Sequence, residues 1–214
     1  MPIRHLIQVI RPLVLFLAAG AIAAFAQPFA ANEWRVREPG DKPLTGERRW
    51  QIYTHNAFAS PGAATRVVIA STMAQIVNGP NEWQRSWSGY GKRVGTSALT
   101  FTAQDTVEHG VAALTGRDPR YQRCQCASVW KRVGHSFTGI FASVDNQGHR
   151  RFDLTHVGGA YAGGYVAASM YPSNYSVAVK GAQLGHRMVG QLFVANLLAE
   201  FSPEMRKLFR RGKK

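Results

Sequence analysis

Acidic residues are scarce in this chain of 214 residues, which contains 12 of them against 26 lysines and arginines. The formal net charge at pH 7 is therefore +14. A chain this basic is expected to be attracted to anionic partners, such as lipid headgroups, lipopolysaccharide phosphates or acidic polysaccharide. The alternative is that the charge only keeps the protein soluble. Nucleic acid is not among the partners that we expect.

The strong catalytic motifs are missing as well. The sequence contains no H-E-x-x-H, no G-x-S-x-G, no Walker loop and no G-x-G-x-x-G that opens a helix after a strand. We therefore predict no cofactor and no resident metal, and we place a non-enzymatic role first.

One arrangement keeps an enzymatic alternative open. Asp105 and His109 lie four residues apart, so on a helix they share a face. A carboxylate that orients an imidazole is the beginning of an acid–base pair. If the fold brought Cys124, Cys126 and His135 close, the group would also suit a metal. The alternative hypothesis is therefore a hydrolase or a metal-dependent enzyme, although most such helical pairs are structural.

Cysteine is nearly absent. The chain has only Cys124 and Cys126, separated by one residue. In an oxidising compartment, we expect them to form a local disulfide that closes almost no loop and adds little stability. A metal or redox role, or free thiols, are the alternatives.

The N-terminus has the pattern of a secretory signal peptide. Arg4 and Arg11 both precede an apolar run over 13–25. Ala24-Phe25-Ala26 then supplies small residues before Gln27. Residues 1–26 are therefore predicted to be removed on export, which lowers the net charge by two, to +12. The expected location is periplasmic or associated with the outer membrane. An uncleaved N-terminal anchor is the alternative.

The rest of the chain is predicted to hold a flexible leader over 27–45 and a single domain over 46–214. Proline, glycine and mixed charge mark the leader. Apolar spacing and capping residues then predict an all-α domain of glycine- and alanine-rich helical hairpins packed as a bundle. A small β-hairpin is placed within 141–152, around an Asn-Gln-Gly turn. A short basic helix is expected over 203–214, starting at Ser202-Pro203.

Small residues recur at helical spacing in the second half of the domain. The packing positions that we predict are Gly159, Gly163 and Ala167 on one helix, and Gly181 and Gly185 on the next. Such faces allow close approach of helix backbones, in soluble proteins as in membranes. We favour a buried soluble hairpin for 154–171 and 176–200. Membrane insertion and association of two copies through these faces are the alternatives.

The C-terminal end is basic and amphipathic. We predict that it lies on an anionic surface. The alternative is a solvated helix end whose cations complement the helix dipole. The residues assigned to this surface are Arg206, Lys207, Arg210, Arg211, Lys213 and Lys214.

Two further patterns bear on function. Trp83, Trp87 and Tyr90 follow helical spacing, which suits either stacking on sugars or bases or, more commonly, one face of a core helix. Residues 92–97 (Lys-Arg-Val-Gly-Thr-Ser) are echoed by residues 131–136 (Lys-Arg-Val-Gly-His-Ser), and each copy opens a helical stretch. A duplicated helical hairpin or chance would produce this echo.

The order of several short motifs resembles an uncharacterised family of small exported bacterial proteins. They extend over about residues 85–200 and comprise Gly89-Tyr90-Gly91-Lys92-Arg93-Val94-Gly95, Asp118-Pro119-Arg120-Tyr121, Asp145-x-x-Gly148, Gly159-Ala160-Tyr161 and Tyr171-Pro172. The resemblance implies an exported helical domain. It carries no known reaction, ligand or catalytic residue, and so leaves the role open.

Overall fold

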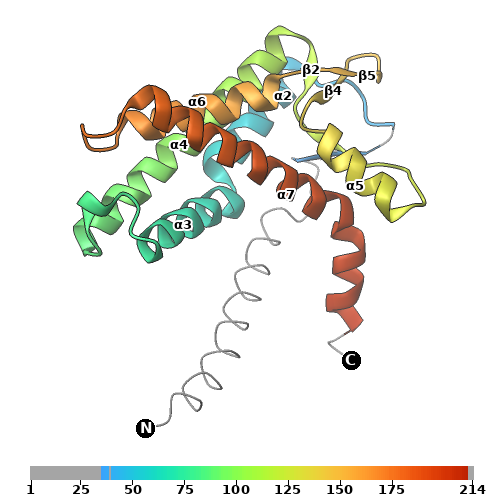
Figure 1. The fold of residues 1–214 in the computed structure, drawn as a ribbon. Helices are drawn as coiled ribbons and strands as arrows, with labels where there is room; N and C mark the ends of the chain where they lie inside the picture. The colour runs from blue at the N-terminus through green and yellow to red at the C-terminus, as the bar shows by residue number, and fades with distance from the viewer. Residues whose placement is uncertain (1–34, 39, 212–214) are drawn as a thin grey trace.

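The computed structural model describes residues 35–38 and 40–211 (Figure 1). This part of the chain is mostly helical with small sheets, which confirms the predicted all-α class. The predicted signal peptide lies outside the described residues. The α-helices are α2 (Gly46–Thr54), α3 (Pro61–Ile76), α4 (Trp87–Leu114), α5 (Val129–Thr138), α6 (Thr155–Ser169) and α7 (Val177–Arg211).

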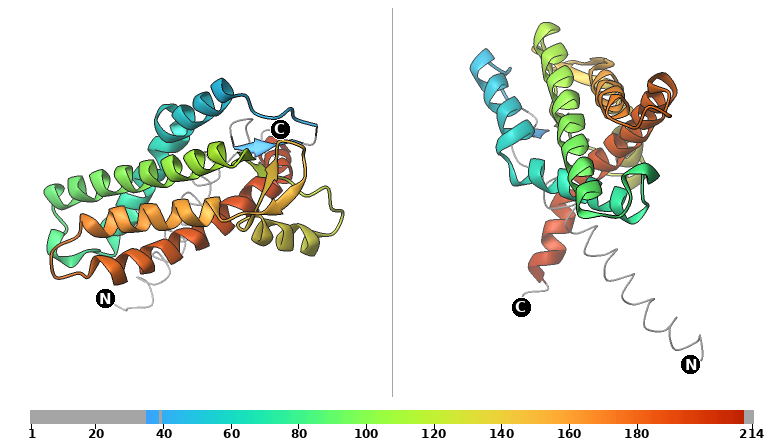
Figure 2. Two further views of the ribbon diagram at one scale, coloured as in Figure 1. Left: turned by 90° about the horizontal axis from the view of Figure 1, so that it is seen from above. Right: turned by 90° about the vertical axis from the view of Figure 1, so that its left-hand side faces the viewer.

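The helices are arranged around α6, which lies between α4 and α7 (Figure 2). Helix α3 packs against α4, and α5 packs against α7. The buried apolar side chains are mainly small, such as Ala112, Ala160 and Ala168. The core therefore depends on close helix approach more than on large interlocking side chains.

Serine caps determine where two of the helices begin. The Ser60 hydroxyl accepts a hydrogen bond from the Ala63 N–H at the start of α3, as the Ser-Pro signal predicts. Asn81, which is also a capping residue type, begins only the short 3-10 helix η2 (Asn81–Trp83). Gln84 has a φ of 52°, which interrupts helical geometry, so α4 begins later, capped by Ser86.

The predicted hairpin is present. Strand β4 (Ala142–Asp145) pairs antiparallel with β5 (Arg150–Phe152), and β2 (Arg117–Asp118) adds a third strand on the other side of β4. Gly148 in the turn has a φ of 86°, which favours glycine. The extra strand was not predicted because two residues give no periodic signal.

The predicted flexible leader requires a correction. Within its described part, β1 (Val36–Arg37) pairs in parallel with β3 (Tyr121–Gln122), and both β1 side chains are buried. Val36 forms an apolar cluster with Tyr121 and Ala199. These residues therefore belong to the folded domain. The partner strand lies more than eighty residues away in the sequence, so the local composition of 27–45 could not predict this pairing.

The predicted separate helix over 203–214 also needs correction, because α7 continues through Pro203. Proline has no N–H to donate to the carbonyl four residues earlier, which is that of Ala199. That carbonyl instead accepts from Ser202 Oγ at 2.8 Å and from Arg123 Nε at 3.0 Å. The lost backbone bond is thus replaced twice over, and the helix does not end.

The small-residue faces are close-packed, but they meet different partners from those expected. An added Cβ at Gly159 or Gly163 would lie 2.8 Å from a backbone carbonyl of α4. It is Gly164 that faces α7, where an added Cβ would lie 2.7 Å from the Gly181 carbonyl oxygen. Ala167 is buried as well. Helix α6 therefore presents two small faces, one to each neighbour.

Gly181 and Gly185 on α7 contact aromatic rings of α6 in addition to the α6 backbone. An added Cβ at Gly181 would strike the Tyr165 ring, and one at Gly185 would strike the Tyr161 ring. In the described part of the chain, no helix has both the length and the apolar character needed to span a membrane.

Candidate functional site

Asp105 is engaged in a buried ion pair rather than in an acid–base pair. Its two carboxylate oxygens accept from both terminal nitrogens of Arg66, which projects from α3, and both side chains are about nine-tenths buried. The Arg66 guanidinium also donates to the Asn56 carbonyl and stacks on Phe101. These hydrogen bonds between Arg66 and Asp105 join α3 to α4.

His109 lies near a second buried pair. Glu108 Oε1 is 3.0 Å from His156 Nδ1 on α6. Burial alone would lower the pKa of His156 and raise that of Glu108, but their mutual attraction outweighs it, so the pKa of His156 is raised and that of Glu108 lowered. Burial lowers the pKa of His109, which therefore stays neutral beside the charged pair.

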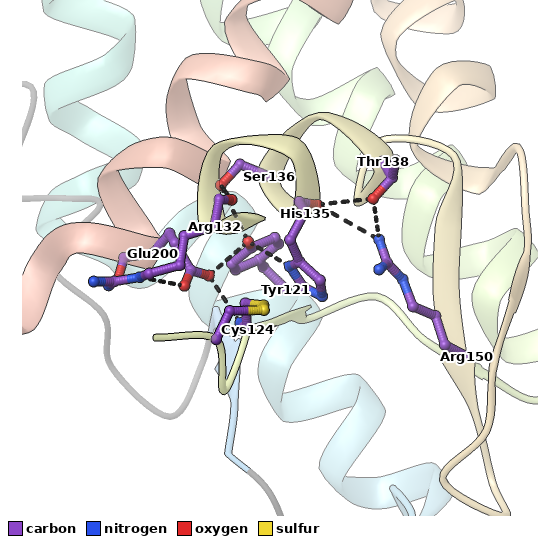
Figure 3. Close-up of a disulfide and its surroundings, with 9 residues drawn as sticks. Tyr121, Cys124, Arg132, His135, Ser136, Thr138, Arg150 and Glu200 are labelled. Carbon is purple, nitrogen blue, oxygen red and sulfur yellow. Dashed lines mark hydrogen bonds and ion pairs between the residues drawn. A yellow bond between two sulfur atoms is a disulfide. The ribbon is translucent and has the colours of Figure 1, made fainter. Parts of the chain in front are cut away.

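The disulfide lies at the edge of a third network (Figure 3). Glu200 is completely buried and accepts from Tyr121 Oη at 2.8 Å, from the Cys124 N–H at 2.9 Å and from Arg132 Nε at 2.9 Å. The Tyr121 hydroxyl also lies 3.0 Å from His135 Nδ1. Burial raises the pKa of Tyr121 and lowers that of His135. The network joins β3, α5 and α7 around one satisfied carboxylate.

These groups do not form the metal site that the enzymatic alternative requires. The sulfur atoms of Cys124 and Cys126 are bonded to each other, so neither is a free thiolate ligand. Among the described residues, no group of three or more histidine, cysteine, aspartate or glutamate side chains is arranged to hold a metal. His135 lies near the disulfide region but is oriented by Tyr121 instead.

A small polar cavity lies between β3, α5, β4 and α6. Its volume of about 10 Å³ is room for about one water molecule. His135, His156, Arg120 and Arg150 contribute to its wall, while neither Asp105 nor His109 does. Asp118 engages the Arg120 guanidinium at 2.9 Å. The cavity is too small for a substrate, and the candidate acid–base residues lie outside it.

Charge is distributed unevenly between interior and surface. Most described carboxylates form ion pairs with arginine or histidine of the same chain, so they do not offset the surface cations. These paired acids are Glu38, Asp41, Asp105, Glu108, Asp118, Asp145, Glu200 and Glu204. Several exposed cations form no ion pair with any carboxylate that the structure describes, namely Lys42, Arg85, Lys92, Lys131, Arg187 and Lys207.

The predicted anionic-surface residues lie at the end of α7. This end projects away from the bundle in Figure 1. Lys207 is exposed, and the side chains of Arg206, Arg210 and Arg211, with all of 212–214, lie outside the described part. Phe201, which would have added apolar contact, is covered instead by the Arg132 guanidinium at 4.2 Å from its ring centroid.

The internal echo contained a signal that sequence reasoning missed. In both copies the lysine is exposed and the arginine makes internal contacts. Arg93 is 1% exposed and donates to the carbonyls of 79, 80 and 84, whereas Arg132 holds Glu200 and Glu204. Each Lys-Arg pair thus lies near the start of a helix and supplies one exposed charge and one arginine with internal contacts.

No family model, no curated protein and no solved structure matches this chain.

Proposed function

We propose that this protein is an exported cell-envelope protein, without enzymatic activity, that binds anionic membrane surfaces through the basic end of α7. The residues assigned to binding are Arg206, Lys207, Arg210, Arg211, Lys213 and Lys214. The predicted signal peptide supports the location, which is periplasmic or at the inner face of the outer membrane.

The observation that carries this proposal is the internal use of the acids. Since most described carboxylates form ion pairs with cations of the same chain, little unpaired negative charge remains to offset the surface lysines and arginines. The nearest described acid to the tail is Glu204, and Arg132 holds it at 2.6 Å. Lys207 is exposed, and we propose that it and the other five tail cations bind phosphate groups. Each contributes about 1 kcal/mol near an anionic bilayer.

The enzymatic alternative has less support. It required a pocket lined by Asp105, His109 and a further polar group. Asp105 is bonded to Arg66, and neither Asp105 nor His109 lines the cavity described above.

Vesicle binding tests the proposal. The chain from Gln27 onward should bind vesicles containing anionic phospholipid and not vesicles of neutral phospholipid. Binding should weaken steeply with salt, because the attraction is screened over about 8 Å at physiological ionic strength. Replacing the six tail cations by Gln should reduce binding to anionic vesicles at least a hundredfold, measured by co-sedimentation.

A variant matched in net charge provides the control. Lys42, Arg85, Lys92, Lys131, Lys180 and Arg187 are replaced by Gln instead, and the tail is left intact. This variant should keep most of the binding. Equal losses in the two variants would show diffuse attraction of the whole body, and equal binding to neutral vesicles would show that charge is not the cause. Either result would contradict the proposal.

A further inference from the structure

A second hollow lies at the other end of α7, away from the basic tail. It is an open groove of about 550 Å³ between η2, one face of α4 and the end of α6. We call it the aromatic groove. Its lining comes from three separate segments and consists of Glu82, Trp83, Lys92, Gly95, Thr96, Met170, Tyr171 and Pro172. A volume of this size accommodates a small ligand or a short segment of a polymer.

The Trp83 and Tyr171 rings form the apolar wall of the groove. They contact each other, and Arg93 contacts the Trp83 ring. Trp83 and Tyr171 meet edge to face, with centroids 5.5 Å apart. The buried Arg93 lies 5.9 Å from the Trp83 ring and donates to backbone carbonyls on either side of η2. The wall is therefore preorganised, and a flat ligand would not have to order it on binding.

The floor contains an unsatisfied polar group. Thr96 is 7% exposed, and its hydroxyl has no hydrogen-bond partner in the structure. The hydroxyl oxygen is itself covered by protein atoms, so the part of Thr96 that lines the groove does not include an open polar contact. Glu82 supplies the carboxylate of the lining, and its oxygens already accept from Asn174 at 2.6 Å and from Tyr175 at 3.2 Å. These bonds hold the turn after α6 against η2.

The surroundings of the groove are positive. Lys92 lies on its edge and is exposed. Lys180 Nζ lies 5.6 Å from the Tyr171 ring centroid and 5.2 Å from that of Tyr175. Arg187 is exposed on α7, and its positive charge favours a lower pKa for Tyr171. Burial outweighs this effect, so the pKa of Tyr171 is raised. Lys92 on the edge and Lys180 beside Tyr171 therefore place positive charge near the groove, while the one lining carboxylate, Glu82, already accepts from two other donors.

From this combination we infer that the aromatic groove binds a carboxylate-bearing sugar unit of an acidic polysaccharide. A sugar ring has a flat face of C–H groups that packs on aromatic rings, and hydroxyl groups at its edge that need polar partners. A carboxylate on the ring pairs with Lys92 or Lys180. The inference takes its choice of an anionic ligand from the proposed function, but it uses none of the tail residues.

Calorimetric titration of the chain from Gln27 onward tests this inference. The probe is oligogalacturonate of about ten units, and the comparison is the same oligosaccharide with its carboxylates reduced to alcohols. The acidic form should bind and the reduced form should bind at least tenfold more weakly. Trp83→Ala and Lys92→Glu should each weaken binding of the acidic form at least tenfold.

The chain offers matched controls for both substitutions. Lys131→Glu makes the same charge change in the echo of the Lys92 segment, and Trp130→Ala removes an indole that is 82% exposed. Both should leave binding within threefold of the unmodified chain. Equal losses for Lys92→Glu and Lys131→Glu, equal binding of the reduced oligosaccharide, or no binding of the acidic form would each overturn the inference.

Trp83→Ala is expected to keep its circular dichroism spectrum. If it unfolds, Lys92→Glu alone decides, since Lys92 is exposed and holds no internal bond in the described structure. Replacing the six tail cations by Gln should leave oligogalacturonate binding within threefold. Failure of vesicle binding with intact glycan binding would therefore contradict only the proposed function, and the reverse result only this inference.

Discussion

Arginine side chains take up space in this core that larger apolar side chains occupy in other proteins. Arg93 is almost completely buried, yet its donors reach three carbonyls and two side-chain oxygens around residues 75–84. Arg66 and Arg132 perform the same task at other helix contacts. The guanidinium suits this role because its five donors point in fixed directions and it stays charged.

The Arg66–Asp105 pair gives the first prediction at this scale. Asp105→Ala leaves a buried guanidinium without its carboxylate, so the free energy of unfolding should fall by about 3–5 kcal/mol. Replacing both residues by apolar ones, as in Arg66→Met with Asp105→Leu, should recover most of that loss. Urea denaturation followed by circular dichroism measures both variants. A neutral Asp105→Ala would show that the pair does not hold α3 to α4.

The Glu108–His156 pair predicts a pH dependence. Glu108 raises the pKa of His156 above its unfolded value of 6.5, so the stabilisation from His156 is complete below pH 6.5 and is lost as pH rises through the folded pKa. The difference in unfolding free energy between the protein and His156→Gln should therefore shrink between pH 6 and pH 9. The slope cannot exceed about 1.4 kcal/mol per pH unit.

Other titrating groups near this pair are controlled within the same experiment. Glu108 has a lowered pKa, so its contribution is present above pH 4.5 and is constant over the range measured. Burial lowers the pKa of His109, so it stays neutral in the folded protein, and the lowered pKa of Asp153 keeps that carboxyl charged over this range. A constant difference for His156→Gln would contradict the assignment.

Candidate residues were easier to select from the sequence than their partners were. The spacing of Asp105 and His109 correctly placed both on one helix. What determines their chemistry is Arg66, thirty-nine residues earlier on another helix, and no local pattern indicates that contact. The same holds for Glu200, whose partners Tyr121 and Arg132 are more than sixty residues away. Spacing reports one face of one helix, and the chemistry depends on what packs against that face.

At the scale of elements, the helices followed their local signals. The start of α3 at Ser60-Pro61 follows its capping signal, and the Asn-Gln-Gly turn lies where the sequence predicted it. The elements that were missed depend on distant partners. The β1–β3 pairing and the passage of α7 through Pro203 both require contacts with the segment around 121–123. Local propensity predicts an element when the hydrogen bonds that form it are local, and it does not predict elements that depend on distant partners.

Glycines of α6 supply a prediction at this scale. A Cβ added to Gly164 would lie within 3 Å of α7 backbone atoms, which cannot move independently, so Gly164→Ala should destabilise by about 1–3 kcal/mol. A Cβ added to Gly158 would have nothing within 4 Å, so Gly158→Ala should stabilise by roughly 0.5–1 kcal/mol through helix propensity. Thermal unfolding of the two variants distinguishes them. Similar effects would show that α6 and α7 do not touch at Gly164.

Gly163 should respond less sharply than Gly164 to the same methyl group. Its nearest neighbours are the flexible end of Met188 and the Thr100 carbonyl oxygen, both at 2.8 Å. The methionine can turn aside, while the carbonyl cannot. The two small faces of α6 therefore differ in tolerance, because one meets a carbonyl and a side chain and the other meets mainly backbone.

For the whole molecule, the separation of charge connects fold to location. Carboxylates are used inside as partners for arginine, and unpaired cations remain on the surface at both ends of α7. We propose that such a molecule is held at an anionic envelope by point charges rather than by a buried span. Its attachment should therefore be strong in dilute buffer and reversible by salt.

Processing and fractionation test this picture in cells. If residues 1–26 are a signal peptide, N-terminal mass spectrometry of the envelope-bound protein should give a chain that begins at Gln27. A wash in 1 M salt should then release most of it, because at that salt concentration the attraction between charges extends over only about 3 Å. Ala26→Leu places a large residue before the cleavage point and should leave Met1 in place. That variant should resist the salt wash, since the apolar segment over 13–25 would still anchor it. A native chain that keeps Met1 and also resists salt would show that the protein is held by an uncleaved anchor, and that its positive surface is not what attaches it.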